Sequence, residues 1–324
     1  MLVINEQDQQ QLLNMKEVID EVAHALKAFS EGKTETPLRY VLPFNNENKY
    51  LVMPALSDEL KIVGIKTVTF APENPEKGKK TITGSVLLSD YETGETLAVL
   101  DGNYLTKIRT GAISGVATKY LAREEAKTLC VIGAGDQAQG LVAAVMAVRN
   151  IDTVHFSSRT KEKANQFADT VAKKYHVTTK VFNVADDAME KADIIVTATN
   201  SSYPVYSRSL KPGVHLNAVG SFKPDMQELP SESMLVANKI VVESVEAAME
   251  ETGDLKVPQD EGLITVNSLY GELGDIVAGN ILGREDNKEV TLFKSVGLAI
   301  VDIVVAHYFY KKALKNSNKN HKIC

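Results

Sequence analysis

A glycine-rich turn joins an apolar run to a run of small residues near the middle of the chain. The apolar residues 128–132 lead into Gly-Ala-Gly-Asp-Gln-Ala at 133–138, and Leu-Val-Ala-Ala follows soon after. In a strand, turn and helix, the first glycine permits the tight turn, the second lets a pyrophosphate approach the backbone, and the alanine lets helix and strand pack closely. The helix start then presents N–H groups and its positive dipole end to the phosphates. The motif predicts a dinucleotide-binding turn made of Gly133, Ala134, Gly135, Asp136, Gln137 and Ala138.

Polar residues follow the next predicted strand, 153–157, where such units recognise the adenosine ribose. An NAD-binding unit carries an acid there for the 2′-hydroxyl. This sequence instead has Ser158, Arg159 and Thr160, and Asp152 stands before the strand, at its wrong end. Arg159 and the two hydroxyls can hold a 2′-phosphate by charge-assisted hydrogen bonds. The sequence therefore predicts NADP(H) as the preferred cofactor, with NAD(H) as the alternative. Arg159 capping a solvated helix start is the competing interpretation.

Two later predicted strands end in small or polar residues. Thr199 and Asn200 follow one apolar run, and Val219 and Ser221 flank Gly220 after another. Ligands of open α/β sheets bind beyond the carboxyl ends of the strands. We therefore expect these residues to border the nicotinamide and its ribose, although ordinary loop chemistry explains them equally well.

Three basic residues in the first third of the chain have apolar neighbours. Arg39 follows Thr-Pro-Leu, Lys66 lies within Val-Gly-Ile-Lys-Thr-Val, and Arg109 lies within Lys-Ile-Arg-Thr-Gly-Ala. Each alone is expected to face solvent from one side of its element. Together they can bind a carboxylate, because Arg offers a bidentate fork and Lys a point charge.

Elements of two kinds must position these groups. Asn14 and Gly32 bracket an amphipathic helix with apolar residues at a 3.6-residue period. Short β-rich runs then predict an antiparallel or mixed sheet, and a helix is expected over 105–121. The predicted strands of that sheet are 40–44, 50–56, 62–70, 81–89 and 96–100.

Strands and helices alternate beyond residue 121, which predicts a doubly wound parallel sheet. The expected strands are 128–132, 153–157, 179–182, 194–199, 215–219 and 240–243. The longest apolar stretch, 292–310, carries Lys294, Asp302 and His307, so we expect a buried helix over 292–314 and no membrane span.

Composition restricts the function classes. Of 324 residues, 36 are Lys or Arg and 42 are Asp or Glu, which gives a net charge of −6. No global positive field exists to hold nucleic acid or an anionic membrane. The sequence has only Cys130 and Cys324 and no Cys/His cluster, which suggests neither a disulfide framework nor a metal site. The N-terminus lacks the pattern of a secretory signal, so the expected compartment is the cytoplasm.

Several ordered motifs resemble the ornithine cyclodeaminase/mu-crystallin family over nearly the whole chain. They are Asp-Gly-Asn-Tyr-Leu-Thr-Lys-Ile-Arg-Thr-Gly-Ala from Asp101, the glycine turn at 133–138, Ala-Val-Gly-Ser-Phe-Lys-Pro-Asp-Met-Gln-Glu-Leu ending at Leu229, Glu-Leu-Gly-Asp from Glu272, and Thr-Leu-Phe-Lys-Ser-Val-Gly from Thr291.

The resemblance implies an α/β fold in which a Rossmann-type doubly wound parallel sheet is inserted in a second α+β domain for substrate binding and dimerisation. We place the inserted domain at 117–299 and the second domain at 1–116 plus 300–324. Family members form homodimers and bind a nicotinamide cofactor with an amino, imino or oxo acid. By the resemblance, Arg39, Lys66 and Arg109 look like the carboxylate-binding residues, Met53 and Thr81 line the pocket, and Thr110 is assigned to the cofactor.

Two departures from the family pattern bear on the reaction. Ornithine cyclodeaminases carry a catalytic Asp two residues after the glycine that corresponds to Gly220, where this chain has Phe222. They also carry an acid two residues before a Met-Pro pair, where this chain has Leu51. Both acidic partners for a second substrate amine are absent, and the segment around Phe222 looks more like the mu-crystallin and ketimine-reductase branch.

With these departures, the resemblance implies an oxidoreductase that reduces cyclic ketimines with NAD(P)H, Δ1-pyrroline-2-carboxylate to L-proline first and Δ1-piperideine-2-carboxylate second. Arg109 would clamp the carboxylate with Arg39 and Lys66, Phe222 would offer the ring an apolar wall, and Lys66 is the candidate proton donor, because neighbouring cations depress a lysine pKa. Ornithine cyclodeaminase, an alanine dehydrogenase-like enzyme and a non-catalytic NADPH-binding protein similar to mu-crystallin stay as alternatives.

Overall fold

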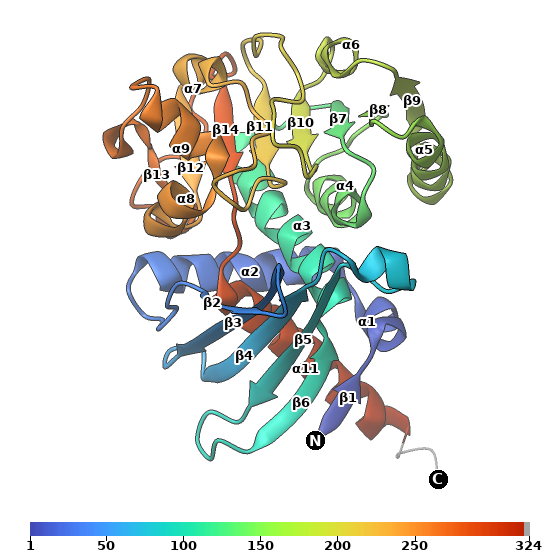
Figure 1. Ribbon diagram of the computed structural model, residues 1–324, viewed down its shortest axis with the longest axis vertical. Helices are drawn as coiled ribbons and strands as arrows, with labels where there is room; N and C mark the ends of the chain where they lie inside the picture. Colours follow the sequence, from blue (N-terminus) through green and yellow to red (C-terminus); the bar gives the residue numbers. More distant parts are fainter. Residues whose placement is uncertain (321–324) are drawn as a thin grey trace. The chain divides into compact units, whose positions relative to one another are not determined.

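The computed structural model describes residues 1–320, with side chains as far as residue 317. The chain divides into two compact units (Figure 1). The first consists of Met1–Arg109 and the described residues from Leu298 onward, and the second of Thr110–Gly297. The dividing points are thus Arg109 and Gly297, whereas the sequence placed domain boundaries at residues 116 and 299. Cys324, considered above as a cysteine without a partner, lies outside the described residues.

A six-stranded mixed sheet forms the first unit. Its order is β1-β6-β5-β4-β3-β2, in which β1 runs parallel to β6 and the other neighbours are antiparallel. The strands are β1 (Leu2–Ile4), β2 (Tyr40–Phe44), β3 (Asn48–Ser57), β4 (Ile62–Phe70), β5 (Ile82–Ser89) and β6 (Thr96–Asp101). The sequence predicted all of these strands except β1, which is too short to show a period.

Helices cover one face of this sheet. They are α1 (Glu6–Leu12), α2 (Met15–Ser30) and α11 (Ala299–Asn320), and α3 (Gly102–Leu121) begins in the same unit. Asn14 caps α2 by accepting a hydrogen bond from the Glu17 N–H, as predicted. Helix α11 packs against α2 and across β3, β4 and β5. The approach is close at Gly64, where a Cβ would lie 2.9 Å from Ile303 Cδ1 and 2.6 Å from the Leu87 carbonyl oxygen.

An eight-stranded parallel sheet forms the second unit. Its order is β13-β12-β14-β11-β10-β7-β8-β9, which can be followed in Figure 1. The strands are β7 (Thr128–Ile132), β8 (Thr153–Ser157), β9 (Thr178–Phe182), β10 (Ile194–Thr197), β11 (His215–Ala218), β12 (Lys239–Val242), β13 (Gly271–Glu272) and β14 (Thr291–Lys294). All pairs are parallel, which confirms the predicted fold class.

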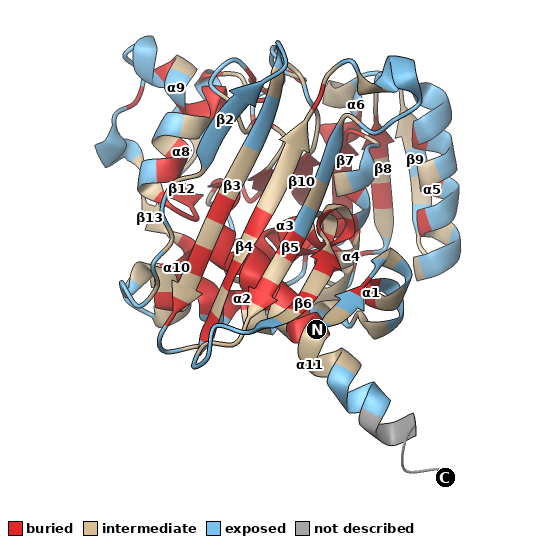
Figure 2. Cartoon of the chain, turned by 60° about the horizontal axis from the view of Figure 1, so that its bottom comes forward, coloured by how far each residue is buried: buried red, intermediate tan, exposed pale blue. Residues whose placement is uncertain are grey.

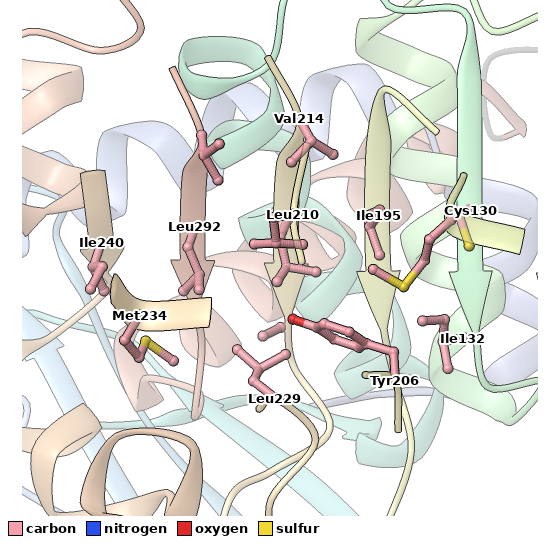
Figure 3. Packing of buried hydrophobic residues seen from close by; sticks show 14 of the residues in the cluster. Cys130, Ile132, Ile195, Tyr206, Leu210, Val214, Leu229, Met234, Ile240 and Leu292 are labelled. Atoms are coloured by element: carbon pink, nitrogen blue, oxygen red, sulfur yellow. The ribbon is translucent and has the colours of Figure 1, made fainter. Parts of the chain in front are cut away.

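Two hydrophobic clusters cover opposite faces of the parallel sheet. Helices α4 (Asp136–Val148) and α5 (Lys161–Tyr175) pack in one cluster. The other cluster contains residues of α6 (Ala185–Met189), α7 (Glu232–Val236), α8 (Val245–Glu251) and α9 (Gly253–Asp260), and Figure 3 shows part of it, with side chains from the strands and from the segments that cover them. Alternating strands and helices therefore place the carboxyl ends of all the strands along one edge of the sheet.

The helix expected over 292–314 is wrong in its first part. Thr291–Lys294 is β14, which lies between β11 and β12, and α11 starts only at Ala299. Gly297, with a φ of 94°, breaks the chain between them. A strand buried on both faces reads as a continuous apolar run, and hydrophobic period alone does not separate such a strand from a buried helix. Across residues 1–320, the structure contains no helix with the length and apolar character that crossing a membrane requires.

Candidate active site

Three charged side chains meet inside the first unit. Lys66 Nζ donates a hydrogen bond of 2.8 Å to Asp302 Oδ1, and Arg109 Nε donates one of 3.2 Å to the same oxygen. Lys66 is 2% exposed, Arg109 8% and Asp302 0%. Charged side chains are almost never so buried unless they are paired, and here the two cations pair with the one carboxylate. We call Lys66, Arg109 and Asp302 the charged cluster.

The cluster comes from three elements that are distant in the sequence. Lys66 lies at the middle of β4, opposite Met53 of β3 in the strand register. Arg109 lies on α3, and Asp302 lies in the first turn of α11. Packing of α11 across β4 brings Asp302 to Lys66. The sequence grouped Lys66 and Arg109 with Arg39 as residues that together can bind a carboxylate, and in the structure Lys66 and Arg109 both donate to Asp302 Oδ1.

The electrostatics of the cluster depend on burial first. The pKa of the Lys66 ammonium is lowered to about 8 in all: burial is the largest cause, Arg109 and Arg39 act in the same direction, and Asp302 opposes them. The neighbouring cations act in the direction expected from the sequence, but desolvation is the larger cause. A lysine with a pKa of about 8 can both carry and release a proton near neutral pH.

Asp302 is the member of the charged cluster that sequence reasoning did not assign to a site. One of its oxygens serves Lys66 and Arg109, and the other, Oδ2, is buried without a hydrogen-bond partner in the described structure. The available signal was a lone acid at the start of an otherwise apolar helix. Arg109 gives Nε to Asp302, so its two terminal nitrogens are the ones suited to a carboxylate in the bidentate geometry.

The remaining residues predicted for the substrate are scattered. Met53 is buried opposite Lys66, and Arg39 is half-buried just before β2. Thr81 precedes β5, five residues from the register partner of Lys66, which is about 16 Å along the strand. The sheet therefore does not bring Thr81 next to the cluster. Phe222 belongs to the other unit, where it is half-buried beneath Lys223, with the Nζ 5.6 Å from the ring centroid.

The glycine turn has the geometry expected of a phosphate site. Gly133 has a φ of 109°, and a Cβ there would lie 2.4 Å from the Ala198 carbonyl oxygen. Gly135 is the N-cap of α4, no side chain caps that helix, and a Cβ on Gly135 would meet nothing within 4 Å. Ala138 is fully buried, and the buried Gln137 Oε1 has no partner in the described structure. An open glycine before an uncapped helix start fits a dinucleotide pyrophosphate.

The groups predicted for the adenosine ribose follow β8. Thr160 is the N-cap of α5, and Arg159 is exposed and makes no ion pair within residues 1–320. Ser158 is half-buried between them and β8. No acid stands at this strand end, and the side chains that follow it are two hydroxyls and a guanidinium.

The ends of β10 and β11 meet at a buried acid. Glu228 accepts hydrogen bonds from the Thr199 and Gly220 N–H groups and from the Thr197 hydroxyl. Ser221 is buried, and Asn200 is exposed. Thr110 of α3 is 6% exposed. The three donors fix the position of the Glu228 carboxyl group.

The two acids of the motif that begins at Glu272 have local hydrogen-bond partners. Glu272 Oε1 accepts a hydrogen bond from the Val245 N–H at the start of α8, and Asp275 Oδ1 accepts one from Asn280; both acids thus stabilise local turns. Within residues 1–320, no group of His, Cys, Asp and Glu side chains is arranged to bind a metal ion.

Comparisons with known proteins agree with this geometry. A profile of the ornithine cyclodeaminase/mu-crystallin family matches residues 1–317. A protein of Bacillus thuringiensis subsp. konkukian (strain 97-27) named Delta(1)-pyrroline-2-carboxylate reductase is 56% identical over 321 residues, 99% of each chain.

Two solved structures have the same fold over nearly their whole length. The Delta(1)-pyrroline-2-carboxylate reductase of Thermococcus litoralis, in complex with NADH and L-proline, superposes with a TM-score of 0.93 at 40% identity and covers 98% of each chain. An archaeal alanine dehydrogenase dimer with bound NAD has a TM-score of 0.91 at 33% identity, covering 98% of this chain and 97% of that one. On these matches, the chain belongs to the ornithine cyclodeaminase/mu-crystallin family.

Proposed function

We propose that this protein is an NAD(P)H-dependent reductase of cyclic ketimines that converts Δ1-pyrroline-2-carboxylate into L-proline. The observation that carries the proposal is the charged cluster, which offers a buried guanidinium for a carboxylate beside a lysine of lowered pKa. The substrate follows from the name that relatives at 54–56% identity share.

The reaction adds one hydride to the imine carbon and one proton to the imine nitrogen. A bound reduced nicotinamide supplies the hydride. Arg109 binds the substrate carboxylate with its terminal nitrogens, Asp302 holds Arg109 and Lys66 in place, and Lys66 donates the proton to nitrogen. Much of the rate enhancement then comes from holding the imine in one orientation.

The chain's acids disfavour a cyclodeaminase. Such an enzyme needs a carboxylate near the second amine of ornithine, and Phe222 occupies the family position for it. Glu228 is fully buried and already accepts three hydrogen bonds, and Asp225 is exposed. An apolar ring at Phe222 makes burial of an ammonium group costly.

The test of the proposal is a panel of reactions followed by nicotinamide absorbance. We expect rapid oxidation of NADPH with Δ1-pyrroline-2-carboxylate, slower oxidation with pyruvate plus ammonia, and negligible proline formation from ornithine with catalytic NAD. Release of ammonia from ornithine at a rate comparable to ketimine reduction would overturn the assignment. NADPH binding without turnover of any substrate would instead favour a binding protein.

We also propose a preference for NADPH, supported by the exposed, unpaired Arg159 and the absence of an acid after β8. The related structures hold NADH or NAD, so this preference needs its own test. Arg159→Asp should remove a contact worth roughly 1.5–3 kcal/mol and repel the 2′-phosphate, which lowers kcat/KM with NADPH by at least tenfold and spares NADH. Wild-type kcat/KM values that are equal for the two cofactors would contradict the preference.

The first unit is proposed to bind substrate and to form a homodimer, and the second to bind the cofactor. Strand β2 lies at the edge of its sheet and is exposed along its length (Figure 2), with large apolar side chains at Tyr40, Val41, Leu42 and Phe44. Exposed apolar edges of this kind mark interaction sites. A related alanine dehydrogenase is a dimer.

The expected oligomer is therefore a dimer by light scattering at micromolar concentration, and Leu42→Lys should shift it toward monomer. As a control, Val184→Lys changes a similarly exposed apolar residue of the other unit and should leave the dimer intact. A monomeric wild-type protein would contradict the proposal.

The proposed compartment is the cytoplasm, where the free, buried thiol of Cys130 stays reduced.

A further inference from the structure

The Glu228 carboxylate connects the ends of two neighbouring strands of the second unit. Its Oε1 accepts a hydrogen bond of 2.6 Å from the Thr199 N–H. Its Oε2 accepts one of 2.7 Å from the Gly220 N–H and one of 2.9 Å from Thr197 Oγ1. Thr197 is the last residue of β10, Thr199 lies two residues beyond it, and Gly220 follows β11. One side chain therefore fixes the backbone of both strand ends.

The fit around this carboxylate leaves no space for a larger residue. A Cβ on Gly220 would lie 2.2 Å from the Thr199 carbonyl oxygen and 2.4 Å from Glu228 Oε1. Glycine is needed at position 220 because the two strand ends and the carboxylate are in direct contact. Any change in the position of Glu228 must therefore move Thr199 or Gly220.

A second pair of charges holds the backbone of Glu228 itself. Asp254 Oδ1 accepts hydrogen bonds from the Glu228 N–H at 2.6 Å and from the Leu229 N–H at 3.0 Å. Lys294 Nζ donates a hydrogen bond of 2.9 Å to Asp254 Oδ2. Glu228, Asp254 and Lys294 are all 0% exposed. Burying charged side chains is costly. These three residues therefore indicate a requirement for fixed backbone positions that apolar side chains, which make no hydrogen bonds, would not meet.

Burial and Asp254 raise the pKa of the Glu228 carboxyl, whereas Lys294 and the Thr199 donor lower it. The three donors aimed at the carboxylate stabilise its ionised form. Oriented N–H and O–H groups thus hold the Glu228 carboxyl group at the carboxyl edge of the sheet, where open α/β sheets bind their ligands.

We infer that Glu228 is a positioning residue, which holds the Thr199 and Gly220–Phe222 segments in the arrangement that receives the nicotinamide half of the cofactor. Ser221 also fixes the segment after Gly220. Its Oγ donates a hydrogen bond of 2.6 Å to the Met226 carbonyl and makes another of 2.6 Å with Thr252 Oγ1. The phosphate turn at Gly133 and Gly135 lies outside these hydrogen bonds. The inference rests on the proposed function only for the identity of the reaction.

The variant Glu228→Gln keeps the size of the side chain but replaces one carboxylate oxygen by an NH2 group. That NH2 group would then face an N–H or O–H donor and could not accept its hydrogen bond. We expect the dissociation constant of NADPH to rise at least fivefold, while that of 2′-phospho-ADP-ribose, which lacks the nicotinamide, changes less than twofold. If the 2′-phosphate proves unimportant, NADH and ADP-ribose replace this pair. The fluorescence of the bound nicotinamide should change, and kcat for the ketimine should fall at least tenfold.

The matched control is Asp193→Asn. Asp193 accepts hydrogen bonds from the Lys127 and Thr128 N–H groups and from Arg123, so it also holds a strand by its carboxylate, but at the amino end of β7. We expect a lower melting temperature and no change in the ratio of the two dissociation constants. A merely structural role of Glu228 would give the same result in Glu228→Gln.

A milder variant, Thr197→Val, removes one donor to Oε2 at nearly constant shape, and it decides the matter if Glu228→Gln does not fold. We expect the same ratio to change in the same direction by a factor of two or more. An unchanged ratio and unchanged nicotinamide fluorescence in the folded variants would overturn the inference. A changed ratio in a protein that reduces no ketimine would support it and would overturn the proposed function instead.

Discussion

Replacing Lys66 by glutamine is expected to lower kcat/KM for Δ1-pyrroline-2-carboxylate by a factor of about 10² to 10⁴, the usual contribution of a positioned proton donor. The wild-type pH profile carries the diagnostic feature. Lys66 has a pKa of about 8, so it is protonated below that pH and loses its proton above it. Wild-type kcat/KM should be level below about pH 8 and fall roughly tenfold per pH unit above it. Lys66→Gln should lose this alkaline limb.

Arg109→Lys is the control that separates proton donation from carboxylate binding. It keeps the positive charge but loses the fork, a loss of roughly 1.5–3 kcal/mol for hydrogen bonds to a charged group. We expect KM to rise about tenfold to a hundredfold and the alkaline limb to remain. Should Lys66→Gln retain both the rate and the limb, the imine arrives already protonated and Lys66 serves only to bind the carboxylate.

Replacing Asp302 by asparagine is expected to cause the largest loss of stability. Lys66 and Arg109 would keep their burial and lose the carboxylate that both contact. Breaking a buried ion pair in this way costs about 3–5 kcal/mol, which lowers the melting temperature by on the order of 10 °C in a chain of this size. Asp302 opposes the lowering of the Lys66 pKa, so its removal should also move the alkaline limb of kcat/KM to below pH 8.

The matched control is another ion pair made by α11 in the first unit. Glu17 of α2 contacts Lys312 of α11 at 2.6 Å, with both side chains partly exposed. Exposed ion pairs contribute little to stability, so Glu17→Gln should leave the pH profile unchanged and the melting temperature nearly so. If Asp302→Asn shifts neither quantity more than Glu17→Gln does, the charged cluster does not control the Lys66 proton.

The two units differ in how much of their structure local sequence patterns predict. In the second unit, the strand, glycine turn and helix at 128–148 are local in the chain, and the physical demands of a phosphate site act on neighbouring residues. Gly133, Gly135 and Ala138 are therefore enough to predict the dinucleotide-binding turn without any long-range information. The period of apolar residues in α2 and the caps at its ends are visible for the same reason.

The sequence indicated two members of the charged cluster but not their contact with the third. Lys66 and Arg109 stand out because each is a charge among apolar residues, but a period-2 or period-3.6 pattern does not state which face an element buries. Asp302 was visible as an acid in an apolar stretch, and its partners lie 236 and 193 residues away in the chain. Nothing local in the sequence connects such groups.

The sequence by itself indicated the α/β class, the glycine turn after β7 and the polar strand ends of the second unit, because each depends on a local pattern of turn chemistry or polarity. The tertiary structure alone decided that 291–294 is a central strand, that Asp302 lies between Lys66 and Arg109, and that Glu228 holds two strand ends together. Each of these depends on burial and on which elements become neighbours. A fully buried segment carries no period that distinguishes strand from helix, and the pKa of a lysine depends on desolvation that only the folded chain supplies.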